Sequence, residues 1–193
     1  MTLILASNSA IRRAMLDAAG IPHIARSPAF DEDLVKERHV GDDETLARRL
    51  AEGKALSVSV AGDDLVIGSD SVVSVDAVRY SKPRDRDDAV AHLRAFSGRT
   101  MLLSSAVALA RSGKIDWSHA ETAQLKVRPL SEAFIAAYLD VEWPEVAQTV
   151  GVFRMEARGA TLFDKVIGGH FTILGMPLLA LLGALRQRGI LVS

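Results

Sequence analysis

The sequence predicts an α/β fold in which helices flank a mixed central β-sheet. Apolar runs typical of strands alternate with segments whose apolar residues recur every three or four positions. Near the middle, Arg111–Lys114 contains a Ser-Gly turn between two strand-like runs, which adds an antiparallel hairpin. The length of 193 residues fits one large domain over residues 1–193, and no segment has the composition of a linker.

The N-terminal segment is expected to form a strand and then a helix. Leu3–Ala6 is a short apolar run, as in a buried strand. The helix after it carries apolar residues at positions 11, 14, 15 and 18, which places them on one face, and it ends at Gly20. The acidic stretch from Phe30 to Glu44 has no such periodicity and is expected to be a surface loop.

Four more helices and three more strands complete the expected order. Asp85 and Ser131 are good N-terminal caps, and Pro177 suits the first turn of a helix. A glycine-containing stretch with glycines at 151, 159, 168 and 169 is expected to be irregular. The remaining elements are a helix at about 44–60, a strand at 65–73, a helix at 85–96, strands at 100–110 and 115–128, a helix after Ser131 and a last helix at Pro177.

Composition excludes several classes of protein. The net charge of -1 provides no global field for binding nucleic acid or an anionic membrane. The absence of cysteine excludes disulfides, thiolate metal sites and a thiol nucleophile. The N-terminus lacks the basic region of a signal peptide, and no apolar run is long enough to span a bilayer. We therefore expect a soluble, cytoplasmic protein.

Polar and basic residues follow the first strand at the start of the first helix. The free backbone N–H groups and positive dipole end of a helix favour an anion here. Ser7 could add a hydroxyl, but Arg12 and Arg13 are unfavourable in a first turn unless something anionic, such as a phosphate chain, lies nearby. The alternative is a capped helix with two solvated arginines.

Three charged residues stand where apolar or neutral ones are expected. Lys54 interrupts the apolar stripe of its helix, so it either extends past the core to solvent or points into a cleft. Asp70 interrupts an apolar strand, where a carboxylate is costly unless it is paired or bound to a cation. Lys82, held before Pro83, either returns to the same pocket or is a surface lysine.

The remaining candidates are acidic. Glu156 lies in the segment Gly151–Gly159, whose glycines suit a loop that approaches a ligand, although an exposed charged loop has the same composition. The sequence contains no P-loop, no GxGxxG, no HExxH and no GxSxG motif. Magnesium needs only one or two carboxylates beside a substrate's own phosphates, which leaves Asp70, Glu32 and Glu156 as candidate ligands.

Taken together, these segments resemble the Maf family of nucleoside triphosphate pyrophosphatases, in order and spacing from the first strand to the last helix. The matching segments are Leu5–Arg13, Asp31-Glu32, Lys54-Ala55, Gly68–Val73, Lys82-Pro83, Phe96–Arg99 and Leu174–Leu178. The resemblance implies a Maf/ITPase-like fold with a cleft between two lobes. It also implies a cytoplasmic, metal-dependent, house-cleaning hydrolase of nucleotide metabolism, usually a homodimer, that releases pyrophosphate.

The resemblance also implies roles for eight residues. Asp70, Lys54 and Lys82 would be catalytic, and Asp70 with Glu32 would hold a magnesium or manganese ion. Asp70 would act as a general base or through the metal. The substrate-binding residues would be Ser7, Arg12, Arg13, Glu32 and Glu156.

Within the family, Ser9–Arg13 and Glu156 look like the branch associated with 7-methyl-GTP, since the dTTP and UTP branch typically has glutamine in place of Glu156. Four positions depart from the family pattern, namely Ala10, Ser71, Met101 and Val150. Three alternatives stay open: a dTTP/UTP pyrophosphatase, a phosphohydrolase that releases orthophosphate, and a non-catalytic nucleotide-binding regulator of cell division.

Overall fold

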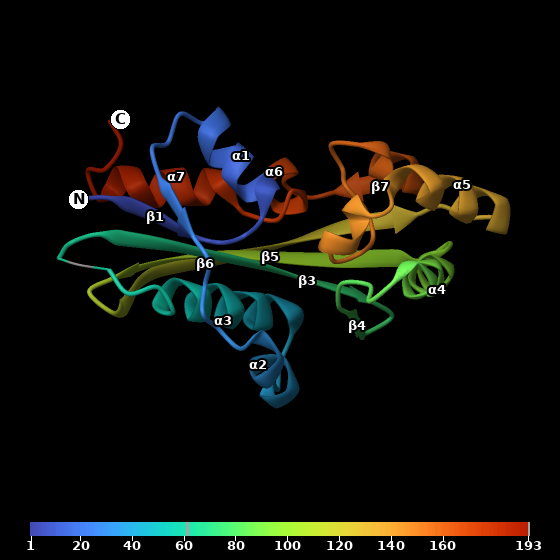
Figure 1. Cartoon of the computed structure of the whole chain (residues 1–193), viewed down its shortest axis with the longest axis horizontal. Helices are drawn as coiled ribbons and strands as arrows, with labels where there is room; N and C mark the ends of the chain where they lie inside the picture. The colour runs from blue at the N-terminus through green and yellow to red at the C-terminus, as the bar shows by residue number, and fades with distance from the viewer. Residues whose placement is uncertain (61, 193) are drawn as a thin grey trace. The chain divides into compact units, whose positions relative to one another are not determined.

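The computed structural model describes residues 1–60 and 62–192 (Figure 1). Its strands are β1 (Leu3–Ala6), β2 (Ile24–Arg26), β3 (Leu65–Val75), β4 (Val78–Tyr80), β5 (Thr100–Arg111), β6 (Lys114–Val127) and β7 (Phe163–Ile167). Its α-helices are α1 (Ala10–Ala18), α2 (Glu32–Arg38), α3 (Asp43–Leu56), α4 (Arg86–Phe96), α5 (Glu132–Glu142), α6 (His170–Ile173) and α7 (Leu178–Gln187). Two short 3-10 helices are η1 (Glu145–Gln148) and η2 (Arg158–Leu162).

The strands form one seven-stranded sheet in the order β2-β1-β3-β5-β6-β7, with β4 paired to β3. The pairs β1–β2 and β1–β3 are parallel, whereas β3–β4 and β6–β7 are antiparallel. The sheet is therefore mixed, and the predicted α/β class is confirmed. None of the helices in the described ranges is both long and apolar enough to cross a bilayer.

The described residues fall into two compact units. The first comprises the described residues of Met1–Ser71, Ser104–Glu121 and Gly169–Ser193. In Figure 1, α1 and α7 of this unit lie on one side of β1 and β3, and α3 lies on the other. Helices therefore cover both faces of the parallel strands, as such strands require.

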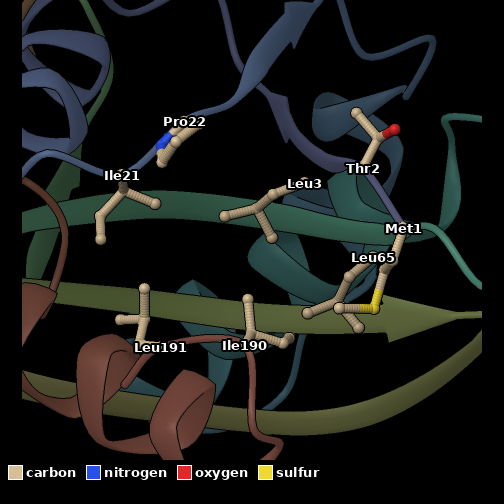
Figure 2. Close-up of a pocket in the computed structure, with 8 residues that line it drawn as sticks. All are labelled: Met1, Thr2, Leu3, Ile21, Pro22, Leu65, Ile190 and Leu191. Atoms are coloured by element: carbon tan, nitrogen blue, oxygen red, sulfur yellow. The ribbon is translucent and has the colours of Figure 1, made fainter. Parts of the chain in front are cut away.

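An apolar pocket of about 190 Å³ lies in the first unit beside the N-terminus (Figure 2). Its walls are Met1, Thr2, Leu3, Ile21, Pro22, Leu65, Ile190 and Leu191. No charged side chain lines it, and most of its walls are aliphatic.

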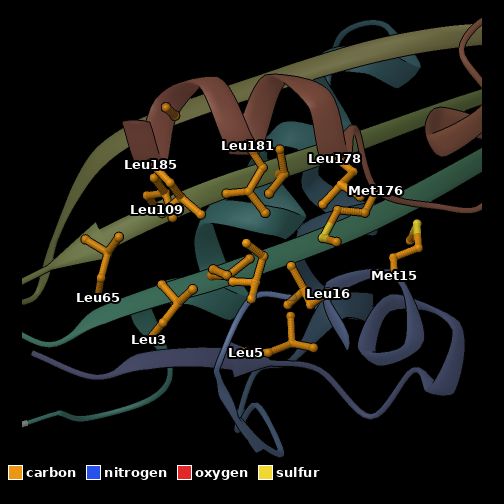
Figure 3. Close-up of a cluster of buried hydrophobic side chains, with 14 residues drawn as sticks. Leu3, Leu5, Met15, Leu16, Leu65, Leu109, Met176, Leu178, Leu181 and Leu185 are labelled. Carbon is orange, nitrogen blue, oxygen red and sulfur yellow. The ribbon is translucent and has the colours of Figure 1, made fainter. Parts of the chain in front are cut away.

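The hydrophobic core of the first unit lies between the sheet and the helices α1 and α7 (Figure 3). Leu3 and Leu5 of β1 and Leu65 and Ile67 of β3 contribute to it, and all four are at most 7 % exposed. Successive side chains of a strand alternate between its faces. The residues of β3 at odd positions therefore face α1 and α7, and those at even positions face α3.

Gly68 shows how closely α3 approaches the even face of β3. A Cβ atom at this position would overlap the carbonyl oxygen of Ala51 and lie 2.5 Å from the backbone nitrogen of Ala55. Only glycine permits this approach. Gly68 lies two residues before Asp70, and Ala55 lies one residue after Lys54. The close contact therefore brings Lys54 near Asp70.

The second unit comprises Val72–Leu103 and Thr122–Gly168. Within it, an ion pair between Arg94 and Glu132, with Nη2 and Oε2 2.7 Å apart, links α4 to α5. A second ion pair, between Arg86 and Asp140, links the same two helices.

The structure corrects several details of the expected order, and it adds the short strands β2 and β4. Residues Glu32–Arg38, expected in a loop, form α2, which Asp31 caps by accepting a hydrogen bond from Leu34 N. No residue of α2 is buried, so hydrophobic periodicity could not reveal it. Helix α3 ends at Leu56, four residues earlier than expected. The irregular stretch contains β7, at Phe163–Ile167, as well as α6.

Candidate active site

Asp70 on β3 lies between two cations that come from different helices. Its Oδ2 is 3.1 Å from Lys54 Nζ on α3, and its Oδ1 is 3.9 Å from Arg12 Nη2 on α1. Oδ1 also accepts a hydrogen bond from Ser71 N at 2.8 Å. Oδ2 is buried and receives no hydrogen bond of good geometry from the described residues. Because a carboxylate oxygen has two lone pairs, Oδ2 can accept from a water molecule or bind a cation in addition to its ion pair with Lys54.

Lys54 does not extend to solvent, because it is only 7 % exposed. Besides Asp70, its Nζ contacts Glu32 Oε1 of α2 at 2.8 Å. Of the two interpretations of Lys54, the structure therefore supports the one in which the side chain points into a polar site. Two carboxylates share one buried ammonium group there.

Glu32 reaches this position because α2 is held against α3. A Cβ atom on Gly53 would overlap the ring of Phe30, so Phe30 packs directly on the backbone of α3, one residue before Lys54. Glu32 follows two residues after Phe30 and also contacts Lys36 Nζ, at 3.1 Å through Oε2. Sequence reasoning missed Lys36, although its i, i+4 spacing from Glu32 was a signal.

The pKa of Glu32 reflects these two cations. Burial alone would raise it, but the hydrogen bonds and charges of Lys54 and Lys36 outweigh burial and lower the pKa from 4.5 to about 2. Because the pKa is lower in the folded protein than in the unfolded chain, ionised Glu32 stabilises the fold above pH 4.5. This contribution to the free energy of unfolding is lost as the pH falls towards 2.

We expect Glu32→Gln to flatten this part of the stability profile, because the variant has no carboxylate to protonate. The free energy of unfolding, measured in urea between pH 2 and 5, should fall less steeply with decreasing pH than in the wild type. Asp33→Asn is the matched control, since Asp33 contacts the same Lys36 at 3.6 Å but its side chain is 87 % exposed, so its loss should change the slope much less. Equal slopes for wild type and Glu32→Gln would contradict the assigned ion pairs.

Arg12 on α1 lies on the opposite face of β3. Its guanidinium donates from Nε to Gly175 O at 2.9 Å, from Nη1 to Ser69 O at 2.8 Å and from Nη2 to Ser71 Oγ at 3.2 Å. Burial lowers the pKa of Arg12, against the opposing charges of Asp70 and Glu32. The interpretation of Arg12 as a solvated arginine is therefore wrong.

The other residues of the N-terminal motif are placed differently. Ser7 is buried at the end of β1, where its Oγ accepts a hydrogen bond from Ser9 N at 3.1 Å. Ser9 caps α1 by accepting from Arg12 N. Arg13 is exposed, so its side chain is free of the core.

Lys82 and Glu156 belong to the second unit, and both are exposed. The loop before Glu156 is fixed rather than loose. Val152 has a left-handed φ of 56°, and its carbonyl accepts a hydrogen bond from Tyr138 Oη at 3.0 Å. Arg154 donates from Nε to the buried Glu142 at 3.0 Å. Glu156 therefore projects from a well-defined loop.

Carboxylate oxygens are the ligands that magnesium and manganese prefer, and Asp70 and Glu32 supply them around Lys54. Asp70 Oδ2 pairs with Lys54 Nζ and retains a further lone pair, which fits such an ion. In residues 1–60 and 62–192, no group of three or more histidine, cysteine, aspartate or glutamate side chains is arranged to hold a metal. The residues therefore fit an ion that takes its other ligands from water and from substrate phosphates.

The chain is similar over almost its whole length to known proteins. The family model described as "Maf-like protein" matches residues 2–188. The 7-methyl-GTP pyrophosphatase of Rhizobium meliloti is 42% identical over 191 residues, covering 97% of this chain and 96% of that protein. The nucleoside triphosphate pyrophosphatase of Paramagnetospirillum magneticum is 42% identical over 193 residues, covering 98% and 100%.

Among solved structures, the nucleoside-triphosphatase / dITP/XTP pyrophosphatase of Mycobacterium abscessus aligns with a TM-score of 0.42 and 18% identity, covering 67% of this chain and 76% of that one. A likeness of this size carries no argument about the chain. The family model and the two relatives do show the family, because each match extends over nearly all of the chain. The chain belongs to the Maf family.

Proposed function

We propose that this chain is a nucleoside triphosphate pyrophosphatase, which hydrolyses its substrate to the monophosphate and pyrophosphate. The observation that carries the proposal is the buried Asp70, which lies between Lys54 and Arg12 and whose Oδ2 pairs with Lys54 and keeps a lone pair for a further ligand. The names of the relatives, all of them pyrophosphatases, support it.

The proposed reaction is attack of water on the α-phosphorus. The new P–O bond forms as the bond to the β-phosphate oxygen breaks, so pyrophosphate leaves and the proton of the water goes to Asp70 or to solvent. Lys54 neutralises negative charge in the transition state. A magnesium or manganese ion, held by Asp70 and Glu32, would supply further charge neutralisation on the phosphates.

The remaining roles rest on the family resemblance. Lys82 is proposed to stabilise the leaving pyrophosphate. The proposed substrate contacts are Ser7, Arg13, Glu32 and Glu156, whereas the guanidinium of Arg12 binds Gly175 O, Ser69 O and Ser71 Oγ. Glu156 is an exposed carboxylate on a loop held by hydrogen bonds, so it is suited to bind the base of the nucleotide. A homodimer acting in a reducing cytoplasm is expected on the same resemblance and on the absence of cysteine.

We further propose that the substrate is a modified guanine nucleotide, 7-methyl-GTP or a close analogue. The name of the relative from Rhizobium meliloti and the presence of Glu156 support this choice. A positively charged methylated base would be attracted to a carboxylate, whereas the glutamine typical of the dTTP and UTP branch has no charge.

A screen of pyrophosphate release tests both parts of the proposal. The wild type is assayed with 7-methyl-GTP, GTP, dTTP and UTP, each with magnesium, with manganese and with chelator. We expect the highest kcat/KM for 7-methyl-GTP and loss of turnover with chelator. Glu156→Gln should lower kcat/KM for 7-methyl-GTP by about tenfold, as expected for one charged contact.

The alternatives predict different results in the same screen. A preference for dTTP or UTP would overturn the proposed substrate but not the reaction. Release of orthophosphate would indicate a phosphohydrolase. Tight binding of a triphosphate without turnover under any metal condition would indicate a regulator.

A further inference from the structure

The guanidinium of Arg12 joins three segments that are far apart in the sequence. It extends from α1 and binds the backbone oxygens of Ser69, on β3, and of Gly175, in the turn between α6 and α7. It also binds the hydroxyl of Ser71. These bonds use three of its five N–H groups. Ser69 and Ser71 flank Asp70, so Arg12 holds the strand on both sides of this residue.

The carbonyl of Gly175 is the point where the contacts converge. Besides Arg12 Nε, the hydroxyls of Ser69 and Ser71 lie within reach of it, at 3.1 and 3.2 Å. A hydroxyl has only one proton to donate. Ser69 Oγ is closer to Ala106 O, at 2.7 Å, so its proton is best placed there.

The proton of Ser71 is also better placed elsewhere. Ser105 Oγ donates to Thr172 O at 2.8 Å, which uses its own proton. Ser105 Oγ is then an acceptor for Ser71 Oγ, 2.9 Å away. Arg12 Nε is therefore the donor on which Gly175 O depends.

We propose that Arg12 is a positioning residue, which fixes the Gly175 turn and, on the two sides of Asp70, the carbonyl of Ser69 and the hydroxyl of Ser71. The expected loss of kcat rests on the proposed function, whereas the expected loosening of the Gly175 turn does not. A positioning role differs from that of a phosphate ligand. Either arginine or lysine could supply the positive charge that binds a phosphate. Lysine keeps the charge but lacks the planar fork that reaches three acceptors at once.

The test compares Arg12→Lys, Ser71→Ala and the double variant with the wild type. Arg49→Lys, a change at an exposed arginine of α3, is the matched control. For Arg12→Lys we expect kcat of pyrophosphate release to fall about 10²-fold with KM changed less than about threefold, as for a displaced catalytic group. Ser71→Ala should lower kcat less, and the double variant should be no worse than Arg12→Lys, because both changes break the same contact.

Hydrogen exchange measures the turn without reference to activity. The amides of Gly175 and Met176 donate to Thr172 O and Phe171 O at 3.0 and 3.1 Å. We expect both to exchange at least about tenfold faster in Arg12→Lys than in the wild type or in Arg49→Lys. Unchanged exchange would overturn the inference, as would an Arg12→Lys variant with raised KM and normal kcat.

The two proposals fail in different ways. A wild type that releases no pyrophosphate would sink the proposed function, while the exchange rates would still decide whether Arg12 fixes the turn. Losses of kcat that multiply in the double variant would show that Arg12 and Ser71 act independently, and would overturn the inference with the enzymatic function intact.

Discussion

Asp70→Asn is expected to lower kcat of pyrophosphate release about 10³-fold or more. Asparagine has nearly the same shape as aspartate, but its amide cannot take a proton from water and is a poor ligand for a divalent cation. Removal of a general base or its metal typically costs 10²- to 10⁴-fold. The comparison is made with saturating substrate and magnesium, so that kcat rather than binding is measured.

The nucleotide should still bind to Asp70→Asn, because Lys54 and the other cations remain. We expect the Kd of a non-hydrolysable triphosphate, measured by calorimetry, to stay within about tenfold of the wild-type value. Asp17→Asn, a change at an aspartate of α1 that is 69% exposed, should leave kcat unchanged. Turnover of Asp70→Asn near the wild-type rate would contradict the proposed mechanism.

Gly68→Ala is expected to lower the free energy of unfolding by about 3 kcal/mol or more, at the upper end of overpacking effects. The added methyl group would meet the backbone of α3 at Ala51 and Ala55, and a helix backbone cannot yield as a flexible side chain can. Helix α3 must then move away from β3. That movement separates Lys54 from Asp70, so the activity of the folded fraction should fall as well.

Gly183→Ala is the matched control for this substitution. Gly183 lies within α7, and a Cβ atom there would meet nothing within 4 Å. Alanine is the better helix former by up to about 1 kcal/mol, so this variant should be slightly more stable than the wild type. Denaturation in urea measures both variants, and a Gly68→Ala protein as stable as the wild type would show that the close approach of α3 is not required.

Much of the fold was predictable because its signals are local. Asp85 and Ser131 cap α4 and α5 as expected, by accepting hydrogen bonds from Asp88 N and Phe134 N. The turn between β5 and β6 has left-handed φ values at Ser112 and Gly113, which suit a two-residue hairpin. The β3–β4 turn was missed because Asp76-Ala77 adopts the same left-handed values without a glycine.

The candidate site was predictable where a charged residue breaks an apolar pattern. Lys54 and Asp70 gave such signals, and the structure brings them together. The Gly175 carbonyl gave none, since its bond to Arg12 joins residues 163 positions apart and uses a backbone atom that every residue has. Tertiary contacts of this kind leave no trace in local periodicity.

The position of bond cleavage is the most direct test of the proposed function. The wild-type protein is incubated with 7-methyl-GTP and magnesium in water enriched in ¹⁸O, and both products are analysed by mass spectrometry. Attack on the α-phosphorus predicts one ¹⁸O atom in the monophosphate and none in the pyrophosphate. Label in the pyrophosphate, or labelled orthophosphate as the product, would contradict the account.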